Sequence, residues 1–286
     1  MLFSDAEIDR LVAEDVPFGD LTTDSLGIGG RAAVMTFTAR SPLVAACTEE
    51  AARVVLHCGG RLTAGPVASG TRCPPGTPLM AAEGTAAALF AAWKVAQNLI
   101  EWASGIATAT RELVDAARAV NPAISIACTR KTVPGTRRFS AKAIRAGGGV
   151  LHRLGLSETI LLFPEHQAFF AGEGGIEAAL RQLQTAVPER TLVIEVKGVD
   201  EALAAADRAD VLQLEKFTPE QVAEVAVAVR RRPGGGPVVA AAGGIGRGNV
   251  AVYAATGADV LVTSAPYTAR PSEVQVRLGP PPPSQA

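Results

Sequence analysis

VLQLEKFTPEQVAEVAVAVRRRPGGGPVVAAAGG, residues 211–244, contains two short apolar runs separated by a longer helical pattern. The runs at 211–214 and 238–242 are too uniformly apolar for half-exposed strands, which is typical of a parallel sheet covered on its faces. Residues 219–231 repeat apolar side chains at helical spacing. The stretch therefore predicts a strand, a covering helix and a second, parallel strand.

The same alternation extends over the second half of the chain. Further apolar runs lie at 124–128, 159–163, 192–196 and 260–263, and further helical patterns at 176–186, 200–206 and 248–256. Six such strands within one region predict a closed or nearly closed α/β barrel. A doubly wound open sheet is the alternative.

The first part of the chain has a different pattern. Helices are expected at 4–14, with Ser4 as N-cap, at 48–57 and at 85–104, and strands at 32–37, 42–46 and within 61–80. This mixture predicts an N-terminal α/β sandwich. We expect domains at 1–107, joined by 270–278, and at 108–269, followed by a disordered Pro-rich tail at 279–286.

Composition limits the class of protein. The 286 residues carry a formal net charge of −1, which argues against a nucleic-acid-binding protein. No apolar stretch is long enough to span a membrane, and the acidic N-terminus does not resemble a secretory signal, so we expect a cytoplasmic protein. Cys47, Cys58, Cys73 and Cys128 are scattered, which favours structural thiols over a metal site or disulfides.

Polar and Gly-rich segments follow the strand-like runs. In chain order they read TRK, FPEH, KG, EKF, GGIG and SAPY. In α/β barrels the C-terminal ends of the strands meet on one face, where active sites are built. These segments are therefore expected to surround one site.

Basic residues concentrate in a stretch that contains no Asp or Glu, from Ala116 to Ser157. In a chain with almost no net charge, this segregation predicts a local positive field. A solvated basic face is the alternative. Arg matches carboxylate and phosphate with a planar fork and Lys supplies a mobile charge, so a pocket with both suits a ligand with both groups. The stretch contains Arg118, Arg130, Lys131, Arg137, Arg138, Lys142, Arg145, His152 and Arg153.

A glycine-rich turn, residues 242–248, joins an expected strand to an expected helix. Backbone N–H groups of Gly243 and Gly244 can approach a phosphate there, and Thr263 and Ser264 after the last strand can complete the cradle. Simple tight turns are the alternative. Three carboxylates near strand ends could hold Mg²⁺ or sugar hydroxyls, although each could be an ordinary ion-pair partner. They are Glu165, Glu195 and Glu215.

Several longer segments resemble one family across almost the whole chain. They are EDVPFGDLTT at 14–23, SGIATAT at 104–110, TRKTVPGTR at 129–137, GGGVLHRLGL at 147–156, LQLEKFTPE at 212–220 and YAATGADVL at 253–261. These segments are similar to the quinolinate phosphoribosyltransferase family, the nicotinate-nucleotide pyrophosphorylases of NAD synthesis.

The resemblance implies an N-terminal α/β sandwich followed by an incomplete α/β barrel of about six or seven strands. It also implies a pentosyltransferase that forms a homodimer, possible also as a hexamer, with active sites shared between subunits. A pyridine nitrogen attacks C1 of phosphoribosyl pyrophosphate, and Mg²⁺ assists departure of pyrophosphate; no protein residue is assigned as a metal ligand. Carried over by position, Arg130, His152 and Arg153 bind the acceptor's carboxylates, and Lys131 serves the pyrophosphate side. The catalytic group is Lys131, Glu195 and Glu215, and the 5′-phosphate cradle is Gly243, Gly244, Ser264 and Ala265.

Four positions depart from the family pattern. Phe163 replaces a lysine that contacts a substrate carboxylate, and Lys94 replaces an arginine supplied by the partner subunit. Lys197 replaces a glutamate, and Glu215 replaces an aspartate. These changes, with LLFPEH and VLQLEKF, are similar to a branch of the family linked with molybdenum-transport loci.

Three functions remain open on these residues. The first is phosphoribosyl transfer to an aromatic acceptor other than quinolinate, and the second is weak use of quinolinate itself. The third is a non-catalytic carrier or sensor of a small anion such as molybdate or phosphate, suggested by Lys197 in place of a carboxylate. In each case the expected partner is a small anionic molecule.

Overall fold

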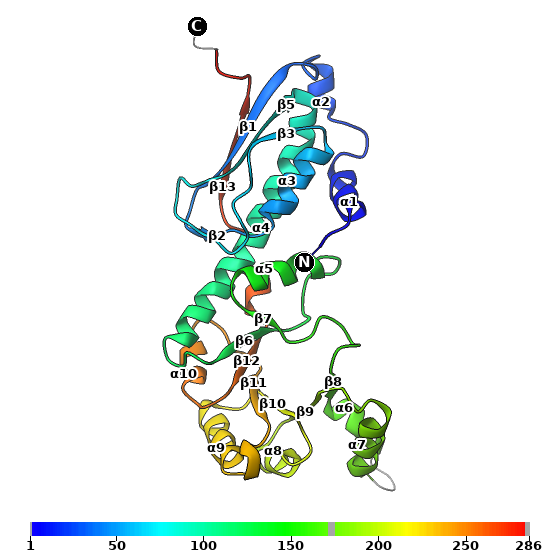
Figure 1. Cartoon of the computed structure of the whole chain (residues 1–286), viewed down its shortest axis with the longest axis vertical. Coiled ribbons are helices and arrows are strands. Elements are labelled where there is room, and N and C mark those ends of the chain that lie inside the picture. Colours follow the sequence, from blue (N-terminus) through cyan, green and yellow to red (C-terminus); the bar gives the residue numbers. More distant parts are fainter. Residues whose placement is uncertain (1, 171–174, 284–286) are drawn as a thin grey trace. The chain divides into compact units, whose positions relative to one another are not determined.

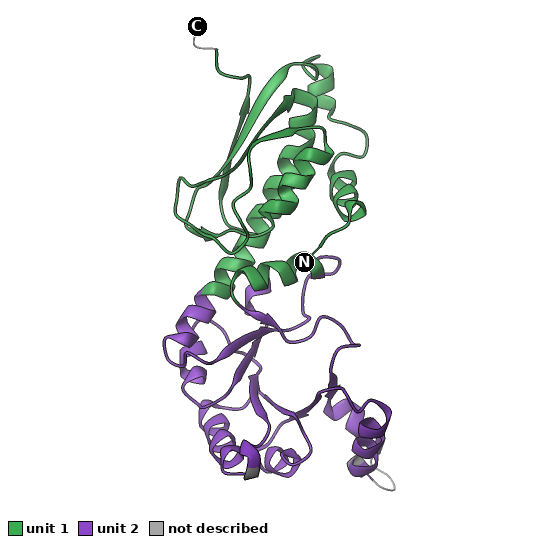
Figure 2. Ribbon diagram, viewed as in Figure 1, with its two compact units in different colours: residues 1–111, 138–148, 268–286 green, residues 112–137, 149–267 purple. Residues whose placement is uncertain are grey.

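The computed structural model describes residues 2–170 and 175–283. Two compact units divide the chain, one formed by residues 1–111, 138–148 and 268–286 and the other by 112–137 and 149–267 (Figure 2). We call them unit 1 and unit 2. No helix within the described residues is long and apolar enough to cross a membrane.

Unit 1 is built on a four-stranded antiparallel sheet with the order β13-β1-β5-β3. Along β1 the side chains alternate between the two faces, and Met35 and Phe37 are fully buried. Helices cover that face (Figure 1), which gives the unit a separate apolar core. The elements are α1 (Asp5–Asp15), α2 (Leu21–Ser25), β1 (Ala32–Ala39), β2 (Leu43–Val44), α3 (Thr48–His57), β3 (Arg61–Ala64), β4 (Arg72–Cys73), β5 (Pro78–Thr85), α5 (Arg137–Ala146) and β13 (Val274–Gly279).

The long helix α4 (Ala86–Arg118) continues 14 residues beyond the end that the sequence predicted at Ser104. Gly105 does not end it, because an added Cβ there would lie 2.3 Å from the carbonyl oxygen of Arg270. Thr108 and Thr110 turn their hydroxyls back to carbonyls one turn earlier. The glycine therefore lets the helix pack closely against the backbone at Arg270 rather than forming a turn.

Unit 2 contains a seven-stranded parallel sheet with the order β7-β6-β12-β11-β10-β9-β8. Five consecutive strands, β8 to β12, follow one another in a single direction, whereas a doubly wound sheet reverses its order near the middle. β7 and β8 are consecutive in the chain but lie at opposite edges, so the barrel is incomplete. The strands are β6 (Ser125–Cys128), β7 (Val150–Leu151), β8 (Ile160–Leu162), β9 (Leu192–Val196), β10 (Val211–Glu215), β11 (Val238–Ala242) and β12 (Val260–Thr263).

Helices cover the outer side of this curved sheet (Figure 1). They are α6 (Pro164–Gln167), α7 (Gly175–Ala186), α8 (Val199–Ala205), α9 (Pro219–Arg230) and α10 (Val250–Ala254). The predicted fold class, an N-terminal α/β sandwich plus an incomplete α/β barrel, is confirmed. The sequence did not predict the helices α2, α5 and α6 or the strands β7 and β13.

The two sides of the barrel sheet are packed differently. Large apolar side chains fill the space between the sheet and the helices. The inner side instead carries a small cluster of Ala127, Ala240, Ala242 and Val262. Because these side chains are short, the C-terminal end of the barrel interior retains a cavity.

Candidate active site

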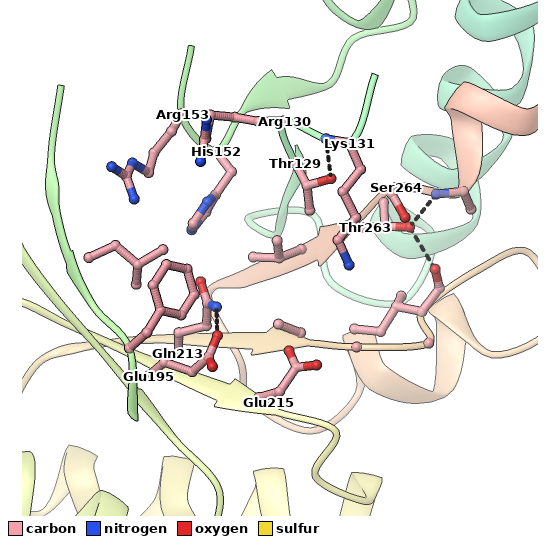
Figure 3. A pocket seen from close by; sticks show the side chains of 18 of the residues that line it. Thr129, Arg130, Lys131, His152, Arg153, Glu195, Gln213, Glu215, Thr263 and Ser264 are labelled. Carbon is pink, nitrogen blue, oxygen red and sulfur yellow. Dashed lines mark hydrogen bonds between the residues drawn. The ribbon is translucent and has the colours of Figure 1, made fainter. Parts of the chain in front are cut away.

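A cavity of about 530 Å³ lies at the C-terminal ends of the barrel strands (Figure 3). All seven barrel strands, including the short β7, end in it or in a loop that borders it. Five of the six predicted strand-end segments contribute lining residues, whereas the KG segment after β9 does not. The lining residues are Thr129, Arg130, Lys131, His152, Arg153, Leu161, Phe163, Glu195, Gln213, Glu215, Ala242, Gly243, Gly244, Ile245, Gly246, Val262, Thr263, Ser264 and Ala265.

The loop after β6 carries Arg130 and Lys131 and is fixed at Thr129. The Thr129 amide donates to the carbonyl of Thr263 (3.0 Å), its carbonyl accepts from the Tyr267 hydroxyl (2.8 Å), and its Oγ1 accepts from the Lys131 amide (3.2 Å). Burial raises the pKa of Tyr267, so this hydroxyl remains a donor. The backbone is therefore held while the two basic side chains project into the cavity.

His152 and Arg153 follow a glycine run whose close packing the structure explains. An added Cβ at Gly147 would lie 2.5 Å from the carbonyl oxygen of Ala107, and Gly148 has φ +84°. The chain then enters β7, and the His152 amide donates to the Cys128 carbonyl (2.9 Å). The glycines thus allow the turn that delivers both side chains to the cavity.

Arg153 is a buried cation without a matching anion. It is 7% exposed, its Nε has no hydrogen-bond partner, and its Nη2 donates to the Leu156 carbonyl at 3.4 Å. No carboxylate of the described residues lies within ion-pair distance of it. Burial first, then repulsion from Arg130, lowers the pKa of Arg153, and the charge of Glu158 opposes this in part. Burial together with both arginines lowers the pKa of His152. The cluster of Arg130, His152 and Arg153 is therefore suited to bind an anionic ligand.

The glycine turn after β11 faces the opposite part of the cavity. Gly244 has φ +73° and open space where a Cβ would stand. Thr263 joins the turn to the loop after β12, because its Oγ1 donates to the Ile245 carbonyl (2.6 Å) and accepts from the Ala265 amide (3.0 Å). The Gly246 amide donates instead to Asn249 Oδ1 (2.8 Å). The cradle thus consists of the Gly243-Gly244 backbone with Ser264 and Ala265.

The sequence predicted that the helix after this turn begins at residue 248, which is two residues too early. Helix α10 begins at Val250 and is a single turn. Its dipole is correspondingly small, so the phosphate cradle depends on backbone amides rather than on a helix N-terminus.

Glu195 on β9 and Glu215 on β10 lie on neighbouring strands. The sequence did not predict a role for Gln213, which lies on β10 in register with Glu195. Gln213 Nε2 donates to Glu195 Oε2 at 2.6 Å, and both side chains are more than nine-tenths buried. Burial, followed by the charges of Glu215 and Glu165, raises the pKa of Glu195 against the lowering effects of Gln213 and Lys197. The signal that could have revealed Gln213 is a polar residue within an otherwise apolar strand.

The basic stretch divides between two roles. Arg130, Lys131, His152 and Arg153 line the cavity, whereas other members form ion pairs within unit 1. Lys142 contacts Glu50 (2.5 Å) and Glu49 (2.8 Å), and Arg138 contacts Glu7 (2.5 Å). The interpretation as one ligand-binding field therefore holds for the strand-end members alone.

Two cations expected near the substrate are not among the lining residues. Lys94 belongs to unit 1, where it lies 4.5 Å from the ring centroid of Trp93. Lys197 is exposed beyond the end of β9, and its amide donates to Glu201. Lys197 acts on the site through its charge near Glu195 rather than by contact with the cavity.

The cysteines and carboxylates offer no metal centre. Cys47, Cys58, Cys73 and Cys128 are free thiols, and burial raises the pKa of Cys128 to about 12. Within residues 2–170 and 175–283, no group of three or more His, Cys, Asp or Glu side chains could hold an ion.

Comparison with known proteins identifies the family. The C-terminal domain of quinolinate phosphoribosyl transferase matches residues 106–276, and the N-terminal domain matches residues 20–104. The chain is 50% identical over 251 residues to the Rhodobacter capsulatus protein named "Putative pyrophosphorylase ModD", covering 87% of this chain and 95% of that protein. It is 34% identical over 278 residues, 92% of this chain and 95% of the relative, to the nicotinate-nucleotide pyrophosphorylase (carboxylating) of Mycobacterium leprae.

Solved structures agree on the fold. NadC from Streptococcus pyogenes superposes with a TM-score of 0.88 at 23% identity, covering 98% of this chain and 99% of that chain. The branch predicted from the LLFPEH and VLQLEKF segments is also confirmed by the ModD relative. Both domains of this chain therefore place it in the quinolinate phosphoribosyl transferase family.

Proposed function

We propose that the protein transfers a phosphoribosyl group from phosphoribosyl pyrophosphate to the nitrogen of an aromatic acid. The observation that carries this proposal is Arg153, a buried guanidinium without an anionic partner that borders the same cavity as the Gly243-Gly244 turn. One end of the cavity suits a carboxylate and the other suits a phosphate. A ligand pair with both groups would satisfy the two ends together.

The residues would act by stabilising charge. Arg153 and Arg130 orient the acceptor through its carboxylate, and His152, held neutral by its surroundings, can donate or accept a hydrogen bond beside them. As the bond to pyrophosphate breaks, C1 becomes cationic and the leaving group gains negative charge. Glu215 is placed to stabilise the former, and Lys131 the latter.

Magnesium fits this site as a companion of the substrate rather than as a resident ion. Among the described residues no three carboxylates gather to hold Mg²⁺ alone, and Glu195 is hydrogen-bonded to Gln213. Glu215 together with pyrophosphate oxygens and water would offer the oxygen ligands that the ion prefers. When bound, the ion would neutralise charge on the departing pyrophosphate.

We further propose a homodimer in which Lys94 of one subunit serves the cavity of the other. Lys94 lies in unit 1 with Asp20 and Trp93 and has no role in its own chain's cavity. A hexamer built from such dimers would preserve the same pairing. Sedimentation at micromolar concentration would test the dimer, and Lys94→Met should weaken acceptor binding without changing unit 2.

Titration calorimetry with phosphoribosyl pyrophosphate, with and without Mg²⁺, tests the proposal directly. We expect binding that strengthens with Mg²⁺; ligand at a hundred times its Kd should stabilise the fold by about 2.7 kcal/mol. Tight molybdate binding without affinity for the sugar phosphate would instead support the carrier hypothesis. That hypothesis rested on Lys197, which does not line the cavity.

A further inference from the structure

The floor of the cavity at β8, β9 and β10 differs chemically from the wall that faces it. Leu161, Phe163, Glu195 and Gln213 form this floor, which we call the β8–β10 floor. Leu162 is in register with Ile194, which places Phe163 beside Glu195, and Glu195 is itself in register with Gln213. The floor therefore contains two apolar side chains, an amide and a carboxyl group, and no cation.

The facing wall carries the positive charge. Arg153 and His152 lie across the cavity from Gln213 and Glu195 (Figure 3). Arg130 is close enough to both to lower their pKa values. An acceptor bound by its carboxylate to this wall would direct its other ring substituents toward the floor.

Gln213 has an unused hydrogen-bond acceptor. Its Nε2 is committed to Glu195, while its Oε1 is buried and has no partner. In Figure 3 this oxygen is on the side of the amide away from Glu195, toward the part of the cavity where His152 lies. A buried acceptor without a partner is costly, so a donor supplied by the ligand would be strongly favoured.

Phe163 is fixed in place rather than free to leave the floor. Its amide donates to His166 Nδ1 at 3.1 Å, and the two rings stack with centroids 5.7 Å apart. A flat ring is thus presented beside the Gln213–Glu195 pair. This surface suits an aromatic ligand and gives no compensation to a negative charge.

We propose, on the basis of the phosphoribosyl transfer inferred above, that the acceptor is a nitrogen heterocycle with one carboxylate and an N–H or O–H donor that binds Gln213 Oε1. A second carboxylate directed at the floor would meet Gln213 Oε1 and Glu195, which repel it. A site built around a buried hydrogen-bonding group discriminates against ligands that leave the group unpaired. The floor therefore disfavours binding of dicarboxylates.

The reaction that follows from this acceptor releases no carbon dioxide. The lone pair of the ring nitrogen forms the bond to C1, and the bond between C1 and the pyrophosphate oxygen breaks, with its electron pair leaving on pyrophosphate. The single carboxylate remains on the ring, held by Arg153. Pyrophosphate is the sole product besides the nucleotide.

Calorimetry with four acids tests this assignment: nicotinate, quinolinate, 2-aminonicotinate and 6-aminonicotinate, each with and without phosphoribosyl pyrophosphate and Mg²⁺. We expect one aminonicotinate to bind about tenfold more tightly than nicotinate, and quinolinate to bind about tenfold more weakly. Gln213→Met should abolish the preference for the aminonicotinate, measured as the ratio of its Kd to the Kd of nicotinate in the same variant. The exposed control Gln275→Met should keep this ratio. Phe163→Lys should raise quinolinate above nicotinate.

Other outcomes overturn the assignment. Quinolinate binding at least as tight as nicotinate, an amino preference that survives Gln213→Met, an unchanged order in Phe163→Lys, or no binding of any acid would each contradict it. The proposed transferase function fails separately, if phosphoribosyl pyrophosphate does not bind with Mg²⁺. The expected ratios among the Kd values of the four acids could then still be observed, so the two failures can be told apart.

Discussion

Replacing Arg153 by Met should stabilise the protein without ligand and remove its affinity for carboxylates. The guanidinium is 7% exposed, its Nε has no partner, and its one hydrogen bond, to Leu156, is long at 3.4 Å. Met has a similar length and carries no charge. A buried ion without a contacting counterion has an effective penalty of several kcal/mol, which the more distant charge of Glu158 reduces in part. Because water in the cavity hydrates the guanidinium in part, we expect Arg153→Met to raise the free energy of unfolding by about 1–2 kcal/mol.

Scanning calorimetry and urea unfolding would measure this gain. At about 2–4 °C per kcal/mol for domains of this size, the melting temperature should rise by about 2–8 °C. The matched control is Arg181→Met, on the exposed face of α7, which should change stability by less than about 0.5 kcal/mol. Nicotinate should stabilise wild type and the control but not Arg153→Met. A fall in stability of Arg153→Met alone would refute the reasoning, because the arginine would then serve the fold itself.

Three further changes test other parts of the structure. Lys216 adopts φ +59°, and Lys216→Asn should raise stability by about 0.5–1 kcal/mol in urea titration, because Asn tolerates this conformation better; lower stability would contradict the assigned strain. Gly244→Ala and its control Gly76→Ala, which share a positive φ and open space, should lose similar stability, but Gly244→Ala alone should weaken binding of phosphoribosyl pyrophosphate in calorimetry. Burial raises the pKa of Glu49, but hydrogen bonds from Lys142 and a serine prevail and lower it from 4.5 to about 2. Its stabilising contribution is complete above pH 4.5 and is lost as pH falls toward 2. Because Glu49 is partly exposed, we expect this contribution to be on the order of 1 kcal/mol. Glu49→Gln should therefore lower the urea midpoint at pH 6 but not near pH 2.

Much of the barrel could be predicted because its strands carry a local signal. Buried parallel strands are apolar on both faces, so 192–196, 238–242 and 260–263 were predicted with the bounds that the structure shows. The two-residue strand β7 was missed because so short a segment has no periodicity. Helix α4 was predicted too short because a glycine within it was compatible with an end, and its close contact with Arg270 is not visible in the sequence.

Part of the cavity lining could be predicted from the sequence, but the contacts between its side chains could not. Strand-end chemistry identified Arg130, His152, Arg153 and Glu215, because parallel strands bring their C-terminal ends to one face. Sequence could not separate Lys142, which is paired with two glutamates distant in the chain, from Arg153, which is paired with none. Both lie in one stretch without acidic residues, and their partners depend on which segments the fold brings near.

The sequence by itself determined the alternation of strands and helices, the single face on which polar segments gather, and the family, because each depends on residues that are neighbours in the chain. The tertiary structure decided which cations have no counterion, that Lys197 lies outside the cavity lining, and that Gln213 has an unused oxygen beside Glu195. These are properties of side chains from separate strands. Register and sheet curvature set their distances, and hydrogen bonding and burial, which determine their chemistry, arise when those strands assemble.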